Sequence, residues 1–318
     1  MRIQIIAHNT KYSEYSPYRW DRMPGLLEKN RHTIDHVLKK DWKDFYSRYK
    51  SFKPDVVISA GMIGFFPTLL KKLGLIRAPI IHDWVDDYQD IMPKKYNKIL
   101  VSFLEKFIIK NTDIVTTQSM YRVEKARRWG KEIKFFPQGV NDNFENRKPV
   151  KLKGAFKILY SGTISYNKRV DRLIKAVEGL ECELYIIGER DREFKERVGS
   201  NVHMLGKVRN NNLPRYLKAS DVLVLTMDAD STLKMYEYLK AGKVILGIKG
   251  KLNFVLTHNK NAYLTNNLRE GIITLMNNRK LMKRLSSGAR RFKVRTWQEV
   301  GKMYSDYITK EVNGKRER

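Results

Sequence analysis

The sequence predicts an α/β protein with a parallel sheet in each half of the chain. Short apolar runs rich in β-branched residues alternate with longer amphipathic segments throughout the 318 residues, and this is the pattern of strands joined by crossover helices. The alternation breaks once, between residues 137 and 154, where Pro, Gly, Asn and charged residues gather. That composition is typical of a linker. We therefore expect two domains of similar architecture.

In the first half, strands and helices are expected in regular succession. Strands are predicted at 3–7, 33–38, 55–59, 79–83, 113–117 and 133–136. Helices are predicted at 20–27, 41–52, 64–73, 93–110 and 121–129. Within the helix over 93–110, Ile99, Leu100, Phe103, Leu104 and Phe107 have the spacing of a stripe that faces the core.

The second half repeats the succession after the break. Strands are predicted at 157–160, 183–187, 202–205, 222–225, 244–246 and 262–264. Helices are predicted at 170–177, 191–198, 213–219, 233–240, 268–277, 279–292 and 296–312.

Composition narrows the class of protein. No apolar run approaches the roughly 20 residues that a membrane-spanning helix needs. The first residues read as a strand rather than a signal peptide. Cys182 is the one cysteine, so an internal disulfide or a cysteine-built zinc site is excluded. We expect a cytoplasmic protein.

The net charge of +29 predicts an anionic partner. Nucleic acid, an anionic membrane surface and phosphorylated substrates all fit this charge. The basic residues are spread along the chain and no RNA-recognition or zinc-finger signature is present, so nucleic acid is the less favoured partner.

The stretch 221–248 reads as one strand–helix–strand unit with a polar turn. In open parallel sheets, ligands bind beyond the carboxyl ends of the strands, where the chain turns into the helix. This turn offers Ser231 or Thr232 as a helix cap, and Lys234 and Glu237 follow. A helix N-terminus attracts phosphate, and Glu237 is suited to accept hydrogen bonds from the vicinal diol of a ribose. The turn therefore suits a nucleotide diphosphate.

Four stretches, in order and at matching spacing, resemble the retaining glycosyltransferases of family four. They are ILYSGTI at 158–164 followed by KRVDRLI at 168–174, YIIGE at 185–189, NVHMLGKV at 201–208 with LPRY at 213–216, and KMYEYLKAGKVI at 234–245. In the first half, FPQGVN at 136–141 and IHD at 81–83 are similar to the family's domain-junction turn and donor-facing strand end.

The resemblance implies the GT-B fold, with two facing Rossmann-like domains and a cleft between them. The first domain would span 1–140 and be joined by the returning helix 296–312. A linker at 141–153 would lead to a second domain at 154–295 that binds the donor. It further implies a retaining transferase that uses a nucleotide-diphosphate sugar, needs no metal and has no separate cofactor.

The resemblance also implies roles for particular residues. His82, Lys168 and Glu237 are expected at the reacting groups: His82 at the donor sugar, Lys168 at a phosphate oxygen and Glu237 at the ribose. The donor would further be contacted by Gly162, Thr163, Gly206, Val208, Arg209, Asp230, Ser231, Thr232, Leu233 and Lys234. Because the leaving phosphate is thought to take the acceptor proton in this family, no enzymic base is named.

The sequence departs from the family in three places. Ala229 stands where the first glutamate of the family's glutamate pair is expected, so Asp228 or Asp230 would contact the donor sugar instead. Thr163 stands in place of a phosphate-binding arginine. The loop at 8–18 lacks the family's glycine pair.

The acceptor and the alternatives are predicted from charge and chemistry. The excess positive charge favours peripheral attachment to the anionic cytoplasmic face of a membrane, through the basic helix 122–128, with a lipid-linked sugar or glycan as acceptor. The alternatives are a GT-B nucleotide-sugar epimerase and a basic nucleic-acid-binding protein with a degenerate GT-B fold. Asp228-Ala-Asp230 also matches a metal-binding Asp-x-Asp pattern, but it lies in the wrong half for the GT-A fold that uses it.

Overall fold

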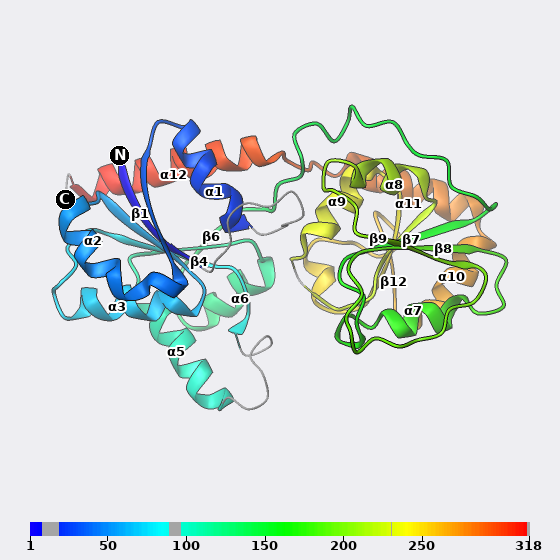
Figure 1. The fold of residues 1–318 in the computed structure, drawn as a ribbon, viewed down its shortest axis with the longest axis horizontal. Helices are drawn as coiled ribbons and strands as arrows, with labels where there is room; N and C mark the ends of the chain where they lie inside the picture. Colours follow the sequence, from blue (N-terminus) through cyan, green and yellow to red (C-terminus); the bar gives the residue numbers. More distant parts are fainter. Residues whose placement is uncertain (8–18, 89–96, 230, 317–318) are drawn as a thin grey trace. The chain divides into compact units, whose positions relative to one another are not determined.

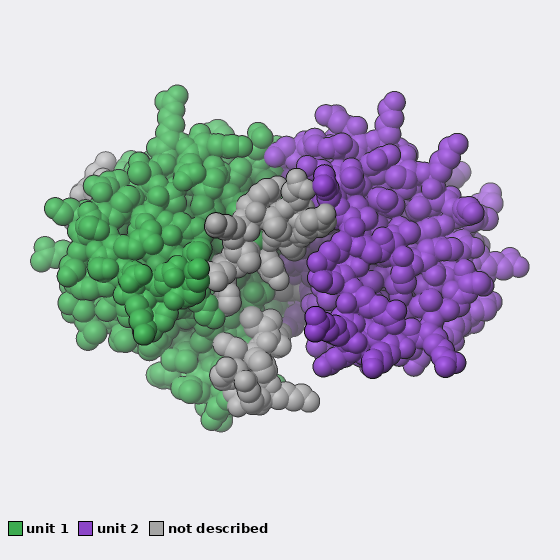
Figure 2. Space-filling view, viewed as in Figure 1, with its two compact units in different colours: residues 1–138, 297–318 green, residues 139–296 purple. Residues whose placement is uncertain are grey.

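The chain folds into two compact units (Figures 1 and 2). The computed structural model describes residues 1–7, 19–88, 97–229 and 231–316. The first unit comprises Met1–Gln138 and Trp297–Arg318, and the second comprises Gly139–Thr296. Each unit is built on one six-stranded sheet whose neighbouring strands are all parallel.

The first sheet has the strand order β2-β1-β3-β4-β5-β6. Its strands are β1 (Arg2–Ala7), β2 (Thr33–Leu38), β3 (Val56–Ala60), β4 (Ile80–Trp84), β5 (Ile114–Thr117) and β6 (Lys134–Phe135). The central strands β3, β4 and β5 are buried along their whole length, as expected for a parallel sheet that helices cover on both faces.

Helices connect these strands. They are α1 (Arg19–Lys29), α2 (Phe45–Phe52), α3 (Phe65–Lys72), α5 (Lys98–Asn111) and α6 (Met120–Arg128), with short 3-10 turns η1 (Lys39–Asp44) and η2 (Met62–Gly64). Asn97 caps α5 and Ser119 caps α6, each with a side-chain oxygen that accepts hydrogen bonds from first-turn N–H groups.

The last helix, α12 (Trp297–Arg316), belongs to the first unit. It lies beside α1 (Figure 1). A Cβ atom on Gly301 would lie 2.8 Å from the Cβ of Leu26, so this glycine allows the two helices to pack closely. Trp297, Val300, Tyr304 and Ile308 are buried. The end of the chain therefore contributes to the core that its beginning forms.

The second sheet has the strand order β12-β11-β10-β7-β8-β9. Its strands are β7 (Lys157–Ser161), β8 (Glu183–Ile187), β9 (Val202–Gly206), β10 (Val222–Leu225), β11 (Val244–Ile248) and β12 (Tyr263–Thr265). The connecting elements are η3 (Tyr166–Lys168), α7 (Val170–Val177), α8 (Leu213–Ala219), α9 (Leu233–Ala241), η4 (Lys251–Phe254), α10 (Leu268–Met276) and α11 (Arg279–Arg291).

Successive residues of these strands face opposite sides of the second sheet. Ile158 packs with α7 and α10 on one face, whereas Leu159 packs with α8 and α9 on the other. Both layers are visible in Figure 1. The predicted α/β fold with parallel sheets is confirmed.

Residues 141–153, expected as a linker, contain no helix or strand and lie within the second unit. Phe144 is buried against the α8–α9 layer. Lys218 on α8 donates hydrogen bonds to the carbonyl oxygens of Phe144, Glu145 and Arg147.

Three predicted helices need correction. The helix over 191–198 is absent, because the Arg190 side chain donates to the carbonyl oxygens of Phe194 and Glu196 and holds an irregular loop. The helix over 41–52 begins only at Phe45, after the 3-10 turn η1. The helix over 93–110 is described from Lys98 onward, and residues 93–96 lie outside the described part of the chain.

The core stripe predicted for the helix over 93–110, which is α5, is wrong. Ile99, Leu100 and Phe103 are 82%, 56% and 65% exposed, and the buried face of α5 carries Val101 and Glu105 with two isoleucines further along. Leu104 and Phe107 are only partly buried.

Glu105 decides which face of α5 turns inward. Its carboxylate accepts hydrogen bonds from Trp84 Nε1 at 3.1 Å and from the Tyr88 backbone N–H at 3.0 Å. Lys125 forms an ion pair with it at 3.0 Å. These partners are distant in the sequence, so apolar spacing along the helix does not reveal them.

Candidate functional site

The carboxyl edge of the second sheet gathers the predicted donor-binding residues. The chain leaves β7 toward β8 and β9, and later returns to the other side of β7 to form β10. The topological switch point therefore lies between β7 and β10, where ligands bind in open α/β sheets. Gly162 and Lys168 follow β7, Lys234 and Glu237 follow β10, and Gly206 ends β9.

The loops after β7 and β8 pass in direct contact. Gly162 N–H donates to the carbonyl of Ile187 at 2.8 Å, and Ile164 N–H donates to that of Glu189 at 2.8 Å. A Cβ atom on Gly188 would lie 1.9 Å from the carbonyl oxygen of Gly162, so only glycine fits at position 188.

Lys234 places its ammonium group against this glycine turn. The Nζ atom lies 4.4 Å from the centre of the Tyr160 ring and donates a hydrogen bond of 3.3 Å to Tyr160 Oη. A Cβ atom on Gly162, whose φ is +133°, would lie 2.5 Å from this Nζ atom. Gly162 therefore leaves the space that the ammonium group occupies.

The electrostatics of Lys234 favour an anionic ligand. The pKa of Lys234 is lowered to about 7, mainly by burial and also by the neighbouring charge of Lys168, whereas Glu237 acts in the opposite direction. Two cationic side chains that repel each other in this way gain from a phosphate placed near both.

The Lys168 turn is fixed by its backbone. Ser165 Oγ accepts from Lys168 N–H at 3.3 Å, and Thr226 Oγ1, just after β10, donates to the Lys168 carbonyl at 2.6 Å. Arg169 takes the left-handed conformation that ends the turn, with φ of 54°. The Lys168 side chain is exposed, as is Thr163, so both are accessible to a ligand.

Helix α9 begins at the same edge. Thr232 is its N-cap residue but makes no side-chain cap hydrogen bond, and its buried Oγ1 has no partner among the residues described. Ser231 and Leu233 flank it. Glu237 is only 7% exposed, and its charge acts on Lys234, three residues earlier. The helix start is thus available for an anion, and Glu237 lies one turn inside it.

Of the two candidate aspartates, Asp228 lies within the described residues. The exposed Asp228 accepts a hydrogen bond of 3.4 Å from the Leu252 backbone N–H and packs on Gly250, where a Cβ atom would lie 2.2 Å from its Oδ2. Asp228 therefore orders the 250–252 turn. Asp230 lies outside the described residues, as does the 8–18 loop.

The predicted base-binding segment follows β9. Gly206 has a φ of 70° and its carbonyl accepts from Gly188 N–H at 2.9 Å, which joins this segment to the glycine turns. The carbonyl of Arg209 accepts from Asn212 and Leu213 and so starts α8. Val208 is partly buried beside the same core layer.

His82 lies in the middle of β4 in the first unit, two residues before the strand ends, and is fully buried. Its Nδ1 lies 3.0 Å from Ser59 Oγ, and its Nε2 lies 3.4 Å from Tyr88 Oη. Burial lowers its pKa to about 4, so the ring is neutral at physiological pH. A Cβ atom on Gly64 would lie 2.6 Å from the ring, so Gly64 makes room for it.

The acidic residues after His82 are engaged by the protein itself. Asp83 is fully buried and accepts from Trp20 Nε1 and Thr116 Oγ1, each at 2.7 Å, and its carboxylate lies 3.1 Å from Arg19 Nε. Asp87 pairs with Lys125 at 2.9 Å. These two carboxylates therefore organise the first unit.

Several residues at these sites had no signal in the sequence. Tyr160 holds Lys234, and Tyr238 Oη accepts from the Ser161 backbone N–H at 3.0 Å, which joins α9 to β7. Ser59 and Tyr88 contact His82. Tyrosines within apolar runs look like ordinary core residues, and only the sheet order shows what they reach.

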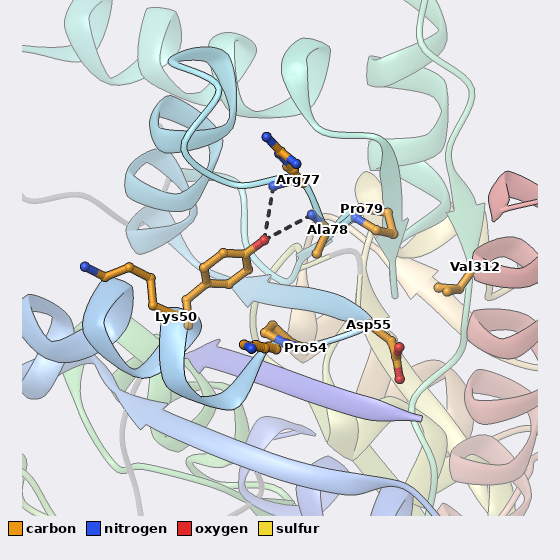
Figure 3. Close-up of a pocket in the computed structure, with 9 residues that line it drawn as sticks. Lys50, Pro54, Asp55, Arg77, Ala78, Pro79 and Val312 are labelled. Atoms are coloured by element: carbon orange, nitrogen blue, oxygen red, sulfur yellow. Dashed lines mark hydrogen bonds between the residues drawn. The ribbon is translucent and has the colours of Figure 1, made fainter.

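A separate hollow of about 470 Å³ lies at the amino edge of the first sheet, where β3 and β4 begin (Figure 3). Tyr49 Oη accepts from the backbone N–H groups of Arg77 and Ala78 at 3.1 and 3.2 Å. The side chains of Lys50 and Arg77 extend outward in different directions. Their charges do not converge, and none of the predicted site residues lines this hollow.

In the described part of the chain, no group of three or more His, Cys, Asp or Glu residues is arranged to hold a metal ion. No helix among the described segments is long and apolar enough to cross a membrane.

Residues 142–292 match the family model for "Glycosyl transferases group 1". They cover nearly all of the second unit. The second unit is a group 1 glycosyltransferase domain. The glycine turns, lysines and glutamate helix described above all lie within this glycosyltransferase domain.

One curated relative is an uncharacterised 41.2 kDa protein in the cps region of Klebsiella pneumoniae. It is 26% identical over 170 residues, which are 49% of this chain and 46% of the relative. The match thus spans less than half of the relative's length.

Solved structures resemble the whole chain at low sequence identity. Anabaena HepE in complex with UDP has a TM-score of 0.73 at 13% identity, with 98% of this chain and 100% of that chain covered. The UDP complex of MnaA from S. aureus has a TM-score of 0.65 at 14% identity, covering 98% and 97%. A UDP-GlcNAc 2-epimerase from Neisseria meningitidis bound to UDP-GlcNAc has a TM-score of 0.59 at 12% identity, covering 98% and 100%. The chain, with its glycosyltransferase domain, has the GT-B fold.

Proposed function

We propose that the protein is a retaining glycosyltransferase that moves a sugar from a nucleotide-diphosphate sugar to a lipid-linked sugar or glycan acceptor. One observation carries this proposal: within a group 1 glycosyltransferase domain, the Lys234 ammonium group lies against a glycine turn at the switch point of the sheet, near enough to Lys168 for the two positive charges to repel each other. UDP is the nucleotide in the HepE and MnaA complexes, and UDP-glucose is bound in another HepE structure, so uridine nucleotides are the first donors to test.

Different residues of the glycosyltransferase domain would bind different parts of the donor. Lys168, Lys234 and the start of α9 would hold the diphosphate, and the glycine turn at Gly162 would let the backbone approach it. Glu237 would accept hydrogen bonds from the ribose hydroxyls. The segment with Gly206, Val208 and Arg209 would contact the base.

Fixed positive charge is the main chemical contribution of this site. As the bond between the sugar and the diphosphate breaks, negative charge grows on the leaving phosphate, and preorganised cations stabilise that change. Lys168 and Lys234 supply two such charges without a metal ion, and we propose a metal-independent reaction for this reason. The neutral His82 ring would accept or donate a hydrogen bond at the donor sugar, after Tyr88 or Ser59 releases one of its nitrogens.

The first experiment measures thermal stabilisation by a panel of nucleotides and nucleotide sugars, with and without magnesium. A ligand that binds only the folded protein raises its melting temperature by mass action. We expect one nucleotide diphosphate to stabilise the protein without magnesium, and Lys168→Ala and Glu237→Ala to abolish the shift. Lys175→Ala, an exposed lysine on the neighbouring helix α7, is the matched control.

Transfer itself is tested with the donor so identified. NMR of the product gives the configuration at the transferred sugar's anomeric carbon, and retention is expected. A donor that binds but yields an inverted product would contradict the retaining mechanism. A protein that binds no nucleotide in the panel would contradict the donor site altogether.

An epimerase is the second candidate, because a UDP-GlcNAc 2-epimerase shares the fold. Epimerisation needs carboxylates poised for proton transfer. Asp83 and Asp87, which follow His82, are instead committed to Arg19, Trp20, Thr116 and Lys125. Incubation with UDP-GlcNAc and analysis of the sugar at C2 decides between the two activities. Nucleic-acid binding without donor turnover would favour the degenerate-enzyme alternative.

A further inference from the structure

Helix α5 carries an exposed apolar surface in its first two turns. Ile99, Leu100 and Phe103 are among the most exposed large apolar side chains in the described part of the protein. In Figure 1 these turns extend past the neighbouring helices α3 and α6 of the same unit. Large apolar side chains gathered in this way mark an interaction site rather than an ordinary surface.

The apolar surface cannot be removed by turning the helix. Glu105, on the opposite face, is bound to Trp84 Nε1, the Tyr88 backbone N–H and Lys125. Rotating α5 to bury Ile99 and Phe103 would break these three interactions and expose Val101. The contacts of Glu105 therefore keep the apolar face of α5 exposed.

Lysines continue the same face toward the end of the helix. At 100° per residue, Lys106 and Lys110 lie on the side of α5 that carries Ile99 and Phe103, and both are exposed. Glu105 is the one acidic residue from 98 to 111 and is buried. The face thus has an apolar tip followed by two positive charges.

The backbone at the tip suits an apolar environment. Asn97 Oδ1 accepts from the N–H groups of Ile99 at 2.9 Å and Leu100 at 3.4 Å, and the Asn97 carbonyl accepts from Val101 N–H at 3.0 Å. Donors that are already hydrogen-bonded add little cost when water is withdrawn from them.

The basic helix expected to contact a membrane is less suited. In α6, Arg122 is buried and donates to Thr117 Oγ1, and Lys125 is paired with Asp87 and Glu105. Arg127 pairs with Glu124. Arg122 and Lys125 thus serve the protein's own structure, and contact of α6 with a membrane stays a prediction.

We propose that α5 docks the protein on an anionic lipid bilayer, with Ile99, Leu100 and Phe103 inserted and Lys106 and Lys110 at the headgroups. An apolar tip with a lysine-bearing flank matches the layering of an anionic membrane surface. A second copy of the chain fits less well, because two proteins of net charge +29 repel each other. The inference deepens the proposed function and rests on its membrane-bound acceptor.

Flotation with lipid vesicles tests the docking. Vesicles of phosphatidylcholine mixed with phosphatidylglycerol should carry the protein upward, and pure phosphatidylcholine vesicles should carry roughly tenfold less. The triple variant Ile99→Gln, Leu100→Gln, Phe103→Gln should lower binding to the anionic vesicles by roughly tenfold. Lys106→Glu with Lys110→Glu should also lower it, as should added salt.

The control replaces two exposed apolar residues of the second unit. Val198 and Ile273 are 41% and 37% exposed, and Val198→Gln with Ile273→Gln should bind vesicles as the unchanged protein does. Insertion is measured separately with an environment-sensitive dye on Phe103→Cys. Cys182, the natural cysteine, is 4% exposed, so labelling can be directed to position 103. The dye should shift to the blue with anionic vesicles.

Other outcomes overturn the inference. The α5 inference fails if the triple variant floats like the unchanged protein, or if the dye at 103 stays in a watery environment. It also fails if the unchanged protein is a dimer that the triple variant dissociates. Thermal stabilisation by the nucleotide donor is measured on the same variants. A triple variant that binds the donor normally but floats poorly separates the docking surface from the donor site.

Discussion

At the scale of single residues, Gly162 and Lys234 depend on each other. The glycine combines a φ of +133° with an ammonium group 2.5 Å from where a Cβ would be. Both conditions favour glycine, one through backbone strain and the other through space.

Gly162→Ala is expected to remain folded but to lose donor binding. The added methyl group would displace the end of the Lys234 side chain, and we expect the dissociation constant for the nucleotide sugar to rise at least roughly tenfold. The backbone strain should lower stability by about 1–3 kcal/mol. Isothermal titration and urea unfolding measure the two effects.

Gly179→Ala is the control for strain alone. Gly179 has a φ of +69° with no neighbouring heavy atom within 4 Å of its Cβ position. Donor affinity should be unchanged in this variant. Normal donor affinity in Gly162→Ala would show that the ammonium position does not matter for binding.

Lys234 should make donor binding depend on pH. Its pKa in the empty site is lowered to about 7, and a bound diphosphate raises it. Below pH 7 the lysine is already protonated and affinity should be level. As the pH rises above 7, binding must take up a proton, and affinity should fall by up to roughly tenfold per unit. UDP-glucose is the ligand of choice because its diphosphate has no proton to lose near neutral pH.

The Lys234→Arg variant tests this assignment. Arginine stays charged over the whole range, so the slope above pH 7 should vanish even if the overall affinity changes. A slope that persists in Lys234→Arg would assign the titration to another group.

At the scale of elements, the buried Asp83 carboxylate joins four parts of the first unit. It lies on β4 and binds Trp20 and Arg19 of α1 and Thr116 of β5. Thr116 Oγ1 in turn lies 3.1 Å from Tyr304 Oη on α12. One carboxylate therefore connects the first helix and the last to the centre of the sheet.

Asp83→Ala should destabilise the first unit strongly. The change leaves the buried Arg19 guanidinium without its anionic partner, and a broken buried pair costs about 3–5 kcal/mol. Tyr304→Phe, which removes one hydroxyl from the same network, should cost only about 1 kcal/mol. Urea unfolding of the two variants checks the difference. Equal costs would mean that Asp83 acts only as one hydrogen-bond acceptor among several.

The bounds of several elements could be predicted from the sequence, but the orientation of α5 could not. The bounds of β2, α7, β8, α8 and β10 were predicted to the residue, because alternating or amphipathic apolar residues define them locally. The inward face of α5 was mispredicted because a buried glutamate, not the apolar stripe, orients the helix. The candidate site divides in the same way. Gly162, Lys168 and Lys234 stand out in the sequence, whereas Tyr160 and Tyr238 acquire their roles only through the order of the strands.

At the scale of the whole molecule, the net charge of +29 destabilises the folded protein as well as attracting anionic partners. Like charges repel more in the compact state than in the unfolded chain. The melting temperature should therefore rise by several degrees when sodium chloride is increased from about 20 to about 200 mM, as screening shortens the range of the repulsion. Differential scanning calorimetry measures this, and a melting temperature that falls with salt would show that net attraction between charges dominates.

The core of the first unit is complete only when α12 has been synthesised and has packed against it. Residues 1–138 and α12 share one core, yet the whole second unit is encoded between them. During synthesis, the early segments of the first unit leave the packing sites of Trp297, Tyr304 and Ile308 uncovered until the whole second unit has been translated. A nascent chain that stops anywhere within the second unit leaves that apolar surface open to chaperones and proteases.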